Sequence, residues 1–286
     1  MNAKNTLLPV QTLLQSKGRL LEISKPIVMG ILNATPDSFY NKGRESSVED
    51  LLRKAEKMLA DGATILDIGG ASTKFGSEWM AAEEELERVL PVVKEIHRHF
   101  PEAWLSCDTY NSKVAEAVVA EGVSIINDIS GGRFDENMLP TVARLNIPYI
   151  AMHLQGTPKT MQQNPVYEEV VYEVRDELRR ICDRCADAGI KDVIIDPGFG
   201  FGKTVAHNFE LLKGMHTLRM LGKPILAGIS RKSMIYKTLM INPEQALNGT
   251  TALHVMALQQ GANILRVHDV KEAVEVIKLW EAMEGS

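Results

Sequence analysis

The sequence contains few cysteines and few aromatic residues. Only 3 of its 286 residues are cysteine, and 6% are aromatic. An odd and small number of cysteines excludes a disulfide scaffold and favours a reducing compartment, so we expect a cytoplasmic protein. Cys182 and Cys185 form a C-x-x-C pair, but no second pair with zinc-type spacing accompanies them. We therefore interpret both as thiols within a helix.

Long apolar runs and clusters of positive charge are also absent. No apolar run is long enough to span a membrane, and residues 1–14 make a poor signal peptide because they lack a continuous apolar core. The formal net charge is −5, and no basic cluster indicates binding to nucleic acid or to an anionic membrane. Any affinity for phosphate groups must therefore come from a local site.

What the sequence does contain is a regular alternation of apolar runs and amphipathic stretches. The apolar runs have the composition of buried strands and lie at 27–33, 64–70, 104–109, 124–129, 148–153, 193–196, 224–230 and 264–268. The stretches with helical spacing follow them at 48–60, 81–99, 112–121, 136–145, 165–188, 207–218, 243–260 and 271–283. Pro91 is expected to bend or interrupt the second of these helices.

This alternation predicts the fold class. Strands that alternate with helices form parallel sheets, and eight such units in one chain favour a single closed (β/α)8 TIM barrel. An open doubly wound sheet is the alternative. We expect the barrel domain over 25–286 and a short N-terminal extension over 1–24, in which Gly18 turns a hairpin.

The richest local signal is the segment 193–204, VIIDPGFGFGKT. Its β-branched run ends at Asp196, and three glycines follow before Lys203. Glycines let a backbone turn sharply and approach a ligand closely. The spacing is not that of a P-loop, and one such segment alone is equally consistent with an ordinary strand-to-helix turn. The segment indicates a ligand site more strongly if other strands also end on polar residues.

The other strands do end on polar residues. Near their carboxyl ends stand Asn33, Asp67, Asp108, Asn127, Asp128, Met152, His153, Asp196, Ser230, Arg266 and His268. In a barrel these ends share the face on which active sites lie. Any one residue could instead cap a helix or be a satisfied core group. Asp108, Asn127 and Asp196 offer acceptors that suit a flat heterocycle with several N–H groups. Arg266, His268 and the nearby Lys232 suit an oxyanion.

At this point the motifs resemble those of the dihydropteroate synthase family. The matching segments are MGILNATPDSF at 29–39, DIGGAST at 67–73, CDTY at 107–110, INDISGG at 126–132, MHLQGTP at 152–158, DPGFGFGK at 196–203, SRKS at 230–233 and RVHD at 266–269. The resemblance runs from about residue 27 to 279. It implies a pterin-binding barrel, usually a homodimer, that joins 4-aminobenzoate to 6-hydroxymethyl-7,8-dihydropterin diphosphate in folate synthesis.

The resemblance also implies roles for individual residues. The pterin would be held by Asp108, Asn127, Met152, Asp196, Gly228 and Lys232, and the diphosphate by Asn33, Arg266 and His268, with Mg²⁺ at Asn33. The aminobenzoate side would be lined by Thr73, Lys74, Phe75, Phe201 and Ser230. Asp108, Lys232, Arg266 and His268 would carry the catalysis. Two other functions stay open, namely a methyltetrahydrofolate methyltransferase-like enzyme and a pterin-binding protein without catalysis.

One loop departs from the family's pattern. Where the family usually has Glu-Ser-Thr-Arg-Pro-Gly, this chain has Ala71-Ser72-Thr73-Lys74-Phe75-Gly76. Lys74 keeps a positive charge without the fork of arginine, and Phe75 replaces a ring that fixes φ. We hypothesise that Phe75 reshapes the outer wall of the aminobenzoate pocket; neutral drift in a loop is the competing interpretation.

Overall fold

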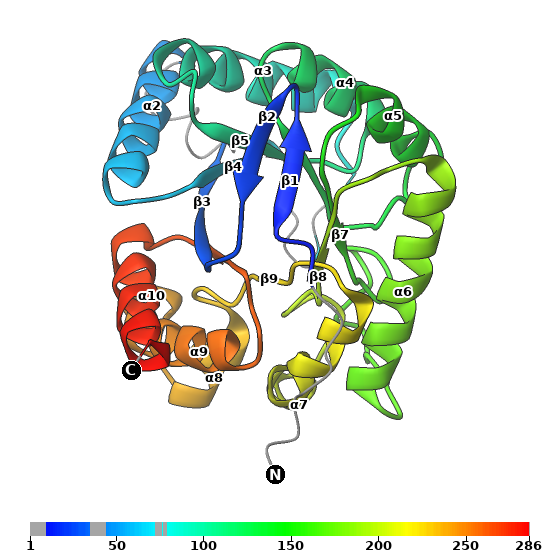
Figure 1. Cartoon of the computed structure of the whole chain (residues 1–286), viewed down its shortest axis with the longest axis vertical. Coiled ribbons are helices and arrows are strands. Elements are labelled where there is room, and N and C mark those ends of the chain that lie inside the picture. Colours follow the sequence, from blue (N-terminus) through cyan, green and yellow to red (C-terminus); the bar gives the residue numbers. More distant parts are fainter. Residues whose placement is uncertain (1–9, 35–43, 72–75, 77–78, 286) are drawn as a thin grey trace.

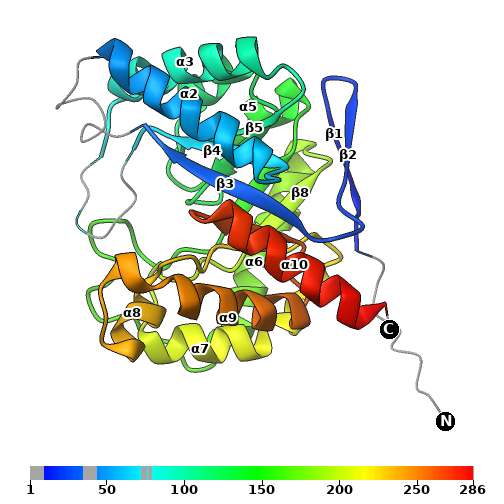
Figure 2. The ribbon, with the colours of Figure 1, turned by 90° about the vertical axis from the view of Figure 1, so that its left-hand side faces the viewer.

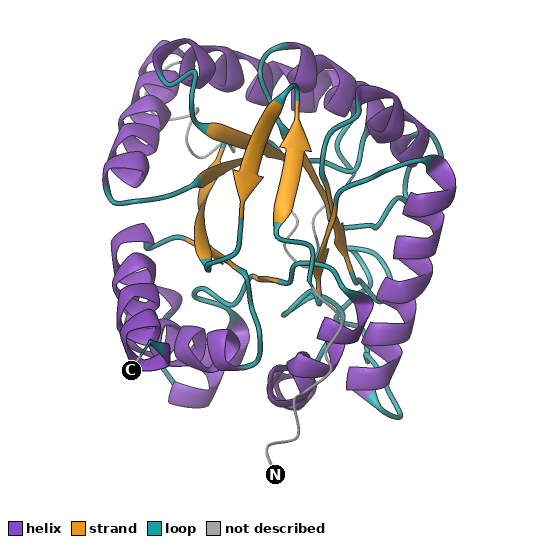
Figure 3. Cartoon of the chain, in the orientation of Figure 1, coloured by secondary structure: helices purple, strands orange, loops and turns teal. Residues whose placement is uncertain are grey.

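The computed structural model describes residues 10–34, 44–71, 76 and 79–285. The β-strands of the main sheet alternate with helices along the chain, and all of them run parallel (Figures 1 and 3). They are β3 (Ile27–Asn33), β4 (Ile65–Gly69), β5 (Trp104–Asp108), β6 (Ile125–Asp128), β7 (Tyr149–Met152), β8 (Val193–Asp196), β9 (Leu226–Ala227) and β10 (Ile264–Val267). Their order in the sheet is β8-β7-β6-β5-β4-β3-β10-β9. The sheet closes through a single bridge between Ile195 and Ile225, so the predicted barrel is confirmed.

Helices surround the barrel on the outside (Figure 1). They are α2 (Arg44–Ala60), α3 (Ala82–His99), α4 (Ser112–Ala120), α5 (Met138–Leu145), α6 (Val170–Ala188), α7 (Val205–Gly214), α8 (Ser233–Leu239), α9 (Leu247–Gln259) and α10 (Val270–Glu284). Short 3-10 helices, η1 (Met215–Leu221) and η2 (Pro243–Gln245), stand between some of them. A layer of buried apolar residues between strands and helices forms the larger core. No helix of the described chain is both long and apolar enough to cross a membrane.

Several details differ from the expected elements. The helix expected over 165–188 begins only at Val170, and the strand expected over 224–230 is reduced to the two residues of β9. The stretch 207–218 is not one helix, because α7 ends at Gly214 and continues as η1. The stretch 243–260 begins as η2, and the short α8 before it was not expected from the periodicity. Pro91 does not interrupt α3. A proline there removes the hydrogen bond to the carbonyl of Glu87, and Glu87 lies on the exposed side of the helix, where water can satisfy that carbonyl.

An antiparallel hairpin, β1 (Leu13–Ser16) and β2 (Arg19–Glu22), lies across one end of the barrel (Figures 1 and 2). Its turn places Lys17 at φ 51° and Gly18 at φ 78°, the left-handed pair of a tight two-residue turn. Leu14, Leu21 and Ile23 bury their side chains against the apolar residues inside the barrel. The hairpin therefore closes the amino-terminal end, although the division into an extension and a barrel domain stays a prediction.

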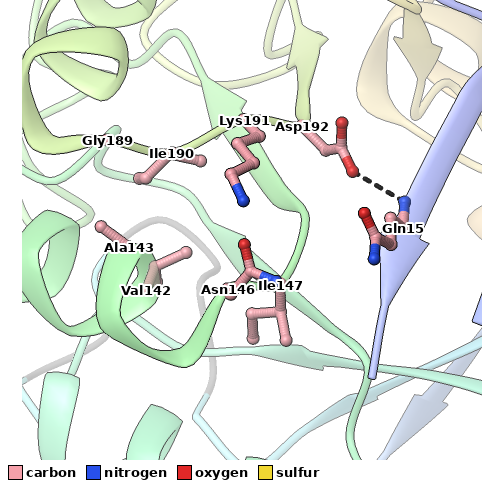
Figure 4. Close-up of a pocket in the computed structure, with 9 residues that line it drawn as sticks. All are labelled: Gln15, Val142, Ala143, Asn146, Ile147, Gly189, Ile190, Lys191 and Asp192. Carbon is pink, nitrogen blue, oxygen red and sulfur yellow. Dashed lines mark hydrogen bonds between the residues drawn. The ribbon is translucent and has the colours of Figure 1, made fainter. Parts of the chain in front are cut away.

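Polar contacts also attach the hairpin. Asp192, just before β8, accepts hydrogen bonds from the backbone N–H of Gln15 at 2.7 Å and from Nε2 of Gln11 at 2.5 Å. Figure 4 shows the Gln15 contact beside a cavity of about 10 Å³, which is also lined by residues of α5 and the turn after it and by the segment between α6 and β8. A cavity of that size holds about one water molecule, so it is not a substrate site.

Candidate active site

The inside of the barrel changes from apolar to mostly polar between one inward-pointing position and the next. Inward-pointing residues near the hairpin form an apolar layer, made by Met29, Ile65, Trp104, Ile125, Ile150, Ile194, Leu226 and Ile264. Because side chains alternate with period 2, the next inward position is two residues later. Those positions hold Ile31, Asp67, Ser106, Asn127, Met152, Asp196, Gly228 and Arg266, of which five are polar. The polar layer therefore lies towards the carboxyl ends of the strands, where barrel enzymes place their active sites.

Arg266 of the polar layer binds two acids, Asp67 in the same layer and Asp108 two residues beyond Ser106 on β5. Its Nε donates to Oδ2 of Asp67 at 2.7 Å, and its Nη2 donates to Oδ2 of Asp108 at 2.9 Å. Asp67 is fully buried, and Asp108 is 9% exposed. Asn127 completes the cluster by donating from Nδ2 to the same Asp67 oxygen at 3.0 Å. Nη1 of Arg266 has no hydrogen-bond partner among the described residues, so one edge of the guanidinium stays available to a ligand.

The environment of Asp108 raises its pKa to about 7, because burial disfavours the charged carboxylate more than Arg266 favours it. For Arg266, burial opposes the charge, but Asp67 and Asp108 outweigh it and raise the pKa above its ordinary value. Two oxygens, Oδ1 of Asp67 and Oδ1 of Asp108, are buried without a hydrogen-bond partner among the described residues. Unpaired buried acceptors carry a large desolvation cost, so they indicate that a ligand with N–H or O–H groups belongs here.

Asp196, at the end of β8, and Lys232, just before α8, form a second cluster. Oδ1 of Asp196 accepts from the N–H of Gly198 at 2.7 Å. A Cβ at Gly228 would lie 3.6 Å from Nζ of Lys232 and 3.9 Å from Oδ2 of Asp196, so the glycine leaves open the space that both groups face. Lys232 also donates to the carbonyl of Phe199. Burial lowers the pKa of Lys232 to about 8, although Asp196 favours its charge.

Phe201 and Met152 supply the apolar wall of this region. Nζ of Lys232 lies 4.7 Å from the centre of the Phe201 ring, a cation–π contact. Met152 belongs to a small buried cluster with Tyr110, against which Phe201 packs. A flat ring bound between these side chains and the acids would meet apolar faces and polar edges, which is the usual make-up of a heterocycle pocket.

The glycine-rich loop is fastened by a residue whose importance the sequence did not indicate. Nζ of Lys203 is buried and donates to the carbonyls of Gly198 at 2.9 Å and Phe201 at 3.0 Å, and it lies 2.9 Å from Nδ1 of His153. Burial lowers the pKa of Lys203 and of His153 well below their ordinary values. Gly198 has φ +68°, and a Cβ there would lie 2.0 Å from the carbonyl oxygen of His153, so glycine is required.

The anion-type residues lie at the ends of β9 and β10. Oγ of Ser230 lies 3.0 Å from Nδ1 of His268 and accepts from the His268 backbone N–H at 3.2 Å. Arg231 has a different task, because its Nε and Nη2 both bind the carboxylate of Asp269 at 2.8 Å. This ion pair holds the loop after β9 to the residue that follows His268.

Asn33 ends β3 and is exposed. Across the described residues no group of three or more His, Cys, Asp or Glu side chains forms a metal cage. Thr73, Lys74 and Phe75 lie outside the described residues, so the hypothesis about the aminobenzoate wall stays a prediction. Of the other residues predicted for the site, the structure brings Asp108, Asn127 and Arg266 into one cluster, and Asp196, Gly228, Lys232 and Phe201 into a second.

Comparison with known proteins gives the class of protein. The sequence matches the pterin-binding enzyme family over residues 29–268. The chain therefore belongs to the family of pterin-binding enzymes.

Similar proteins within this family are dihydropteroate synthases. The enzyme of Haemophilus influenzae is 43% identical over 271 residues, covering 94% of this chain and 98% of that protein. The Escherichia coli K12 enzyme is 44% identical over 269 residues, covering 93% and 95%. The crystal structure of the Yersinia pestis dihydropteroate synthase with a sulfonamide drug complex has a TM-score of 0.90 at 41% identity, covering 96% of this chain and 100% of that chain. The Xanthomonas albilineans enzyme in complex with 7,8-dihydropteroate has a TM-score of 0.85 at 39% identity, with 96% and 99% covered. These matches confirm the predicted family, barrel fold and transferase activity in folate synthesis.

Proposed function

We propose that this chain joins 4-aminobenzoate to 6-hydroxymethyl-7,8-dihydropterin diphosphate and releases 7,8-dihydropteroate and diphosphate, through polar residues at the carboxyl ends of the strands. The observation that carries this proposal is that acceptors and cations adjoin at this one end of the barrel. Asp108, Asn127 and Asp196 suit the N–H groups of a pterin, whereas Arg266 and Lys232 lie beside them as donors.

The pterin residues have two tasks in this proposal. Asp108, Asn127 and Asp196 bind and orient the ring through its N–H groups, and Met152 and Phe201 cover its faces. When the bond from the exocyclic methylene carbon to the diphosphate oxygen breaks, positive charge spreads from that carbon over the ring. The buried acids nearby stabilise this charge in a preorganised, water-poor site.

The diphosphate is assigned to Arg266, His268 and Asn33. Arg266 has its Nη1 free of hydrogen-bond partners within the described chain, and His268 is held by Ser230. Magnesium usually takes only one or two protein ligands, the rest coming from phosphate and water. The amide oxygen of Asn33 is a ligand of the right kind, so the residues fit Mg²⁺ bound together with the diphosphate. When bound, the ion would neutralise part of the charge on the leaving group.

The amine of 4-aminobenzoate then attacks the methylene carbon. A carbon–nitrogen bond forms, the carbon–oxygen bond breaks, the diphosphate leaves with the electron pair, and the amine loses a proton. Phe201, Ser230, Thr73, Lys74 and Phe75 are assigned to this substrate. An arylamine is weakly basic and is already unprotonated at neutral pH, so positioning it matters more than activating it. The reaction therefore needs no covalent nucleophile.

We also propose that the chain works as a homodimer in the cytoplasm. Large apolar side chains are exposed on three helices that pack against one another at the end of the chain, namely Leu239 and Met240 near α8, Met256 on α9, and Leu279 and Met283 on α10. Exposed apolar groups of this kind are typical of subunit interfaces, and sedimentation velocity measures the oligomeric state directly. The three cysteines are unpaired, as suits a reducing compartment.

A coupled assay of diphosphate release tests the activity. We expect release when the pterin diphosphate and 4-aminobenzoate are both present, and none above the uncatalysed rate when the amine is omitted. Arg266→Ala should lower kcat/KM by about a hundredfold or more, because it removes a preorganised charge at the leaving group. Arg144→Ala, which removes an exposed arginine paired with Glu116, is the matched control. Binding of the pterin without diphosphate release would favour the non-catalytic alternative.

A further inference from the structure

Asp67 is buried in the polar layer but has no role in the reaction proposed above. It lies on β4, opposite Ser106 of β5, and is fully buried. One of its oxygens, Oδ2, accepts from Asn127 Nδ2 at 3.0 Å and from Arg266 Nε at 2.7 Å. Both partners belong to the proposed substrate site. Through this oxygen, Asp67 therefore contacts residues that bind the substrate and not the substrate itself.

The contact with Asn127 has a fixed direction. The amide of asparagine has a donor end and an acceptor end of nearly the same shape, and only its partners decide which way it points. An aspartate oxygen that already accepts from a guanidinium can only accept from the amide, so the NH₂ end of Asn127 must face Asp67. The carbonyl oxygen of Asn127 is thereby left for a ligand, and Asn127 is only 4% exposed.

The contact with Arg266 has a parallel effect on Asp108. Nη2 of Arg266 lies 2.6 Å from Oδ2 of Asp67 as well as 2.9 Å from Oδ2 of Asp108. Asp67 therefore shares the guanidinium and keeps it from pairing with Asp108 alone. Oδ1 of Asp108 stays without a hydrogen-bond partner among the described residues, so it remains an acceptor that a ligand could use.

We propose that Asp67 is a positioning residue that sets the hydrogen-bonding direction of the pterin pocket. It turns Asn127 so that an oxygen faces the ring, and it holds Arg266 so that Asp108 keeps a free oxygen. The pocket then presents acceptors, which selects rings that carry donors at the matching edge. This inference rests on the proposed function, since it takes the bound ring to be a pterin.

An isosteric exchange separates this role from simple packing. In Asp67→Asn the side-chain volume is kept, but the negative charge that the Asn127 amide and Arg266 both face is lost, and an NH₂ group can now face either of them. The same exchange is also made in Asn127→Ala, where the amide that Asp67 orients is absent, so that a double-mutant cycle isolates the effect that passes through Asn127. Ser106→Ala is the matched control, since it removes the polar group of the register partner in the same layer.

Titration calorimetry with 6-hydroxymethylpterin provides the measurement, and thermal unfolding confirms that each variant is folded. We expect Asp67→Asn to weaken binding by about tenfold or more when Asn127 is present, as for loss of a buried hydrogen bond, and Ser106→Ala to bind like wild type. In the Asn127→Ala background the same exchange should weaken binding by about threefold or less. Should Asp67→Asn not fold, Asp67→Ala takes its place in the same cycle.

The outcomes distinguish the two proposals. If the wild-type chain does not bind the pterin, the proposed function fails. If the wild type binds and Asp67→Asn binds equally well, or if the exchange weakens binding as much in the Asn127→Ala background as beside Asn127, Asp67 does not set the direction of the pocket and the proposed function stands without it.

Discussion

At the scale of single residues, burial next to other charged groups changes the pKa of Asp108. Asp108 is held among Arg266, Asp67 and the neighbouring acids, and its pKa rises to about 7. An acid with a usual pKa of 3.8 is thus partly protonated at neutral pH in the folded chain. A ligand that brings N–H groups to its oxygens would favour the charged form and lower the pKa again.

This raised pKa makes stability depend on pH. The folded chain holds a proton on Asp108 that the unfolded chain releases above about pH 4. The stability that this group contributes is therefore present below that pH and is lost as the pH rises towards 7. We expect Asp108→Asn, which cannot ionise, to gain stability relative to wild type between pH 4 and 8, by at most roughly 4 kcal/mol.

Thermal unfolding of both proteins across this pH range measures the effect. Asp187→Asn, an exposed aspartate on α6, serves as the control substitution. Parallel melting-temperature curves for wild type and Asp108→Asn would show that Asp108 keeps an ordinary pKa in the folded chain.

The sequence predicted a large part of the site at this scale, for a physical reason. Parallel strands end on one face, and period-2 alternation sends residues such as Asp196 and Arg266 inward. The sequence could not predict which of these charged side chains form ion pairs with one another. Arg266 meets Asp67 across 199 positions of the chain, and that pairing exists only because the barrel brings β10 and β4 to either side of β3. Lys203 was likewise seen only as the end of a loop motif.

At the scale of elements, the hairpin closes one end of the barrel, and the loops and strand ends at the other end form the site. The hairpin fills the amino-terminal end with Leu14, Leu21 and Ile23, whereas the site lies towards the carboxyl ends of the strands. The sequence indicated a turn at Gly18 but could not show where the hairpin packs, because its four-residue strands carry too short a pattern to identify a partner. The helix α8 was missed for the same reason, since it has only 7 residues.

Two leucines of the hairpin offer a matched test of its task. Leu14 is fully buried, and Leu20 is 62% exposed. We expect Leu14→Ala to lower the free energy of unfolding by about 2–4 kcal/mol, as for other buried leucines, and Leu20→Ala to change it by less than about 0.5 kcal/mol. Urea denaturation gives both values. Equal losses for the two variants would mean that the hairpin does not close the core in solution.

At the scale of the whole molecule, one strand pattern produces both stability and chemistry. Each of the strands contributes one residue to the apolar layer near the hairpin and, two positions later, one residue to the polar layer. The sequence therefore predicted the barrel, its active face and the family together. It did not predict the internal balance of the site, in which two acids share one arginine, because that balance depends on distances of a few ångströms between strands.

The central claim is that the site at the carboxyl ends of the strands has one group of residues that binds the pterin ring and another that binds the diphosphate. The most direct test is the ratio of two dissociation constants in His268→Ala, one for 6-hydroxymethylpterin and one for its diphosphate ester. His268 is outside the acid cluster, so we expect the variant to weaken binding of the ester by about tenfold or more while the bare pterin changes by less than about twofold. Equal losses for the two ligands would contradict this division of the site.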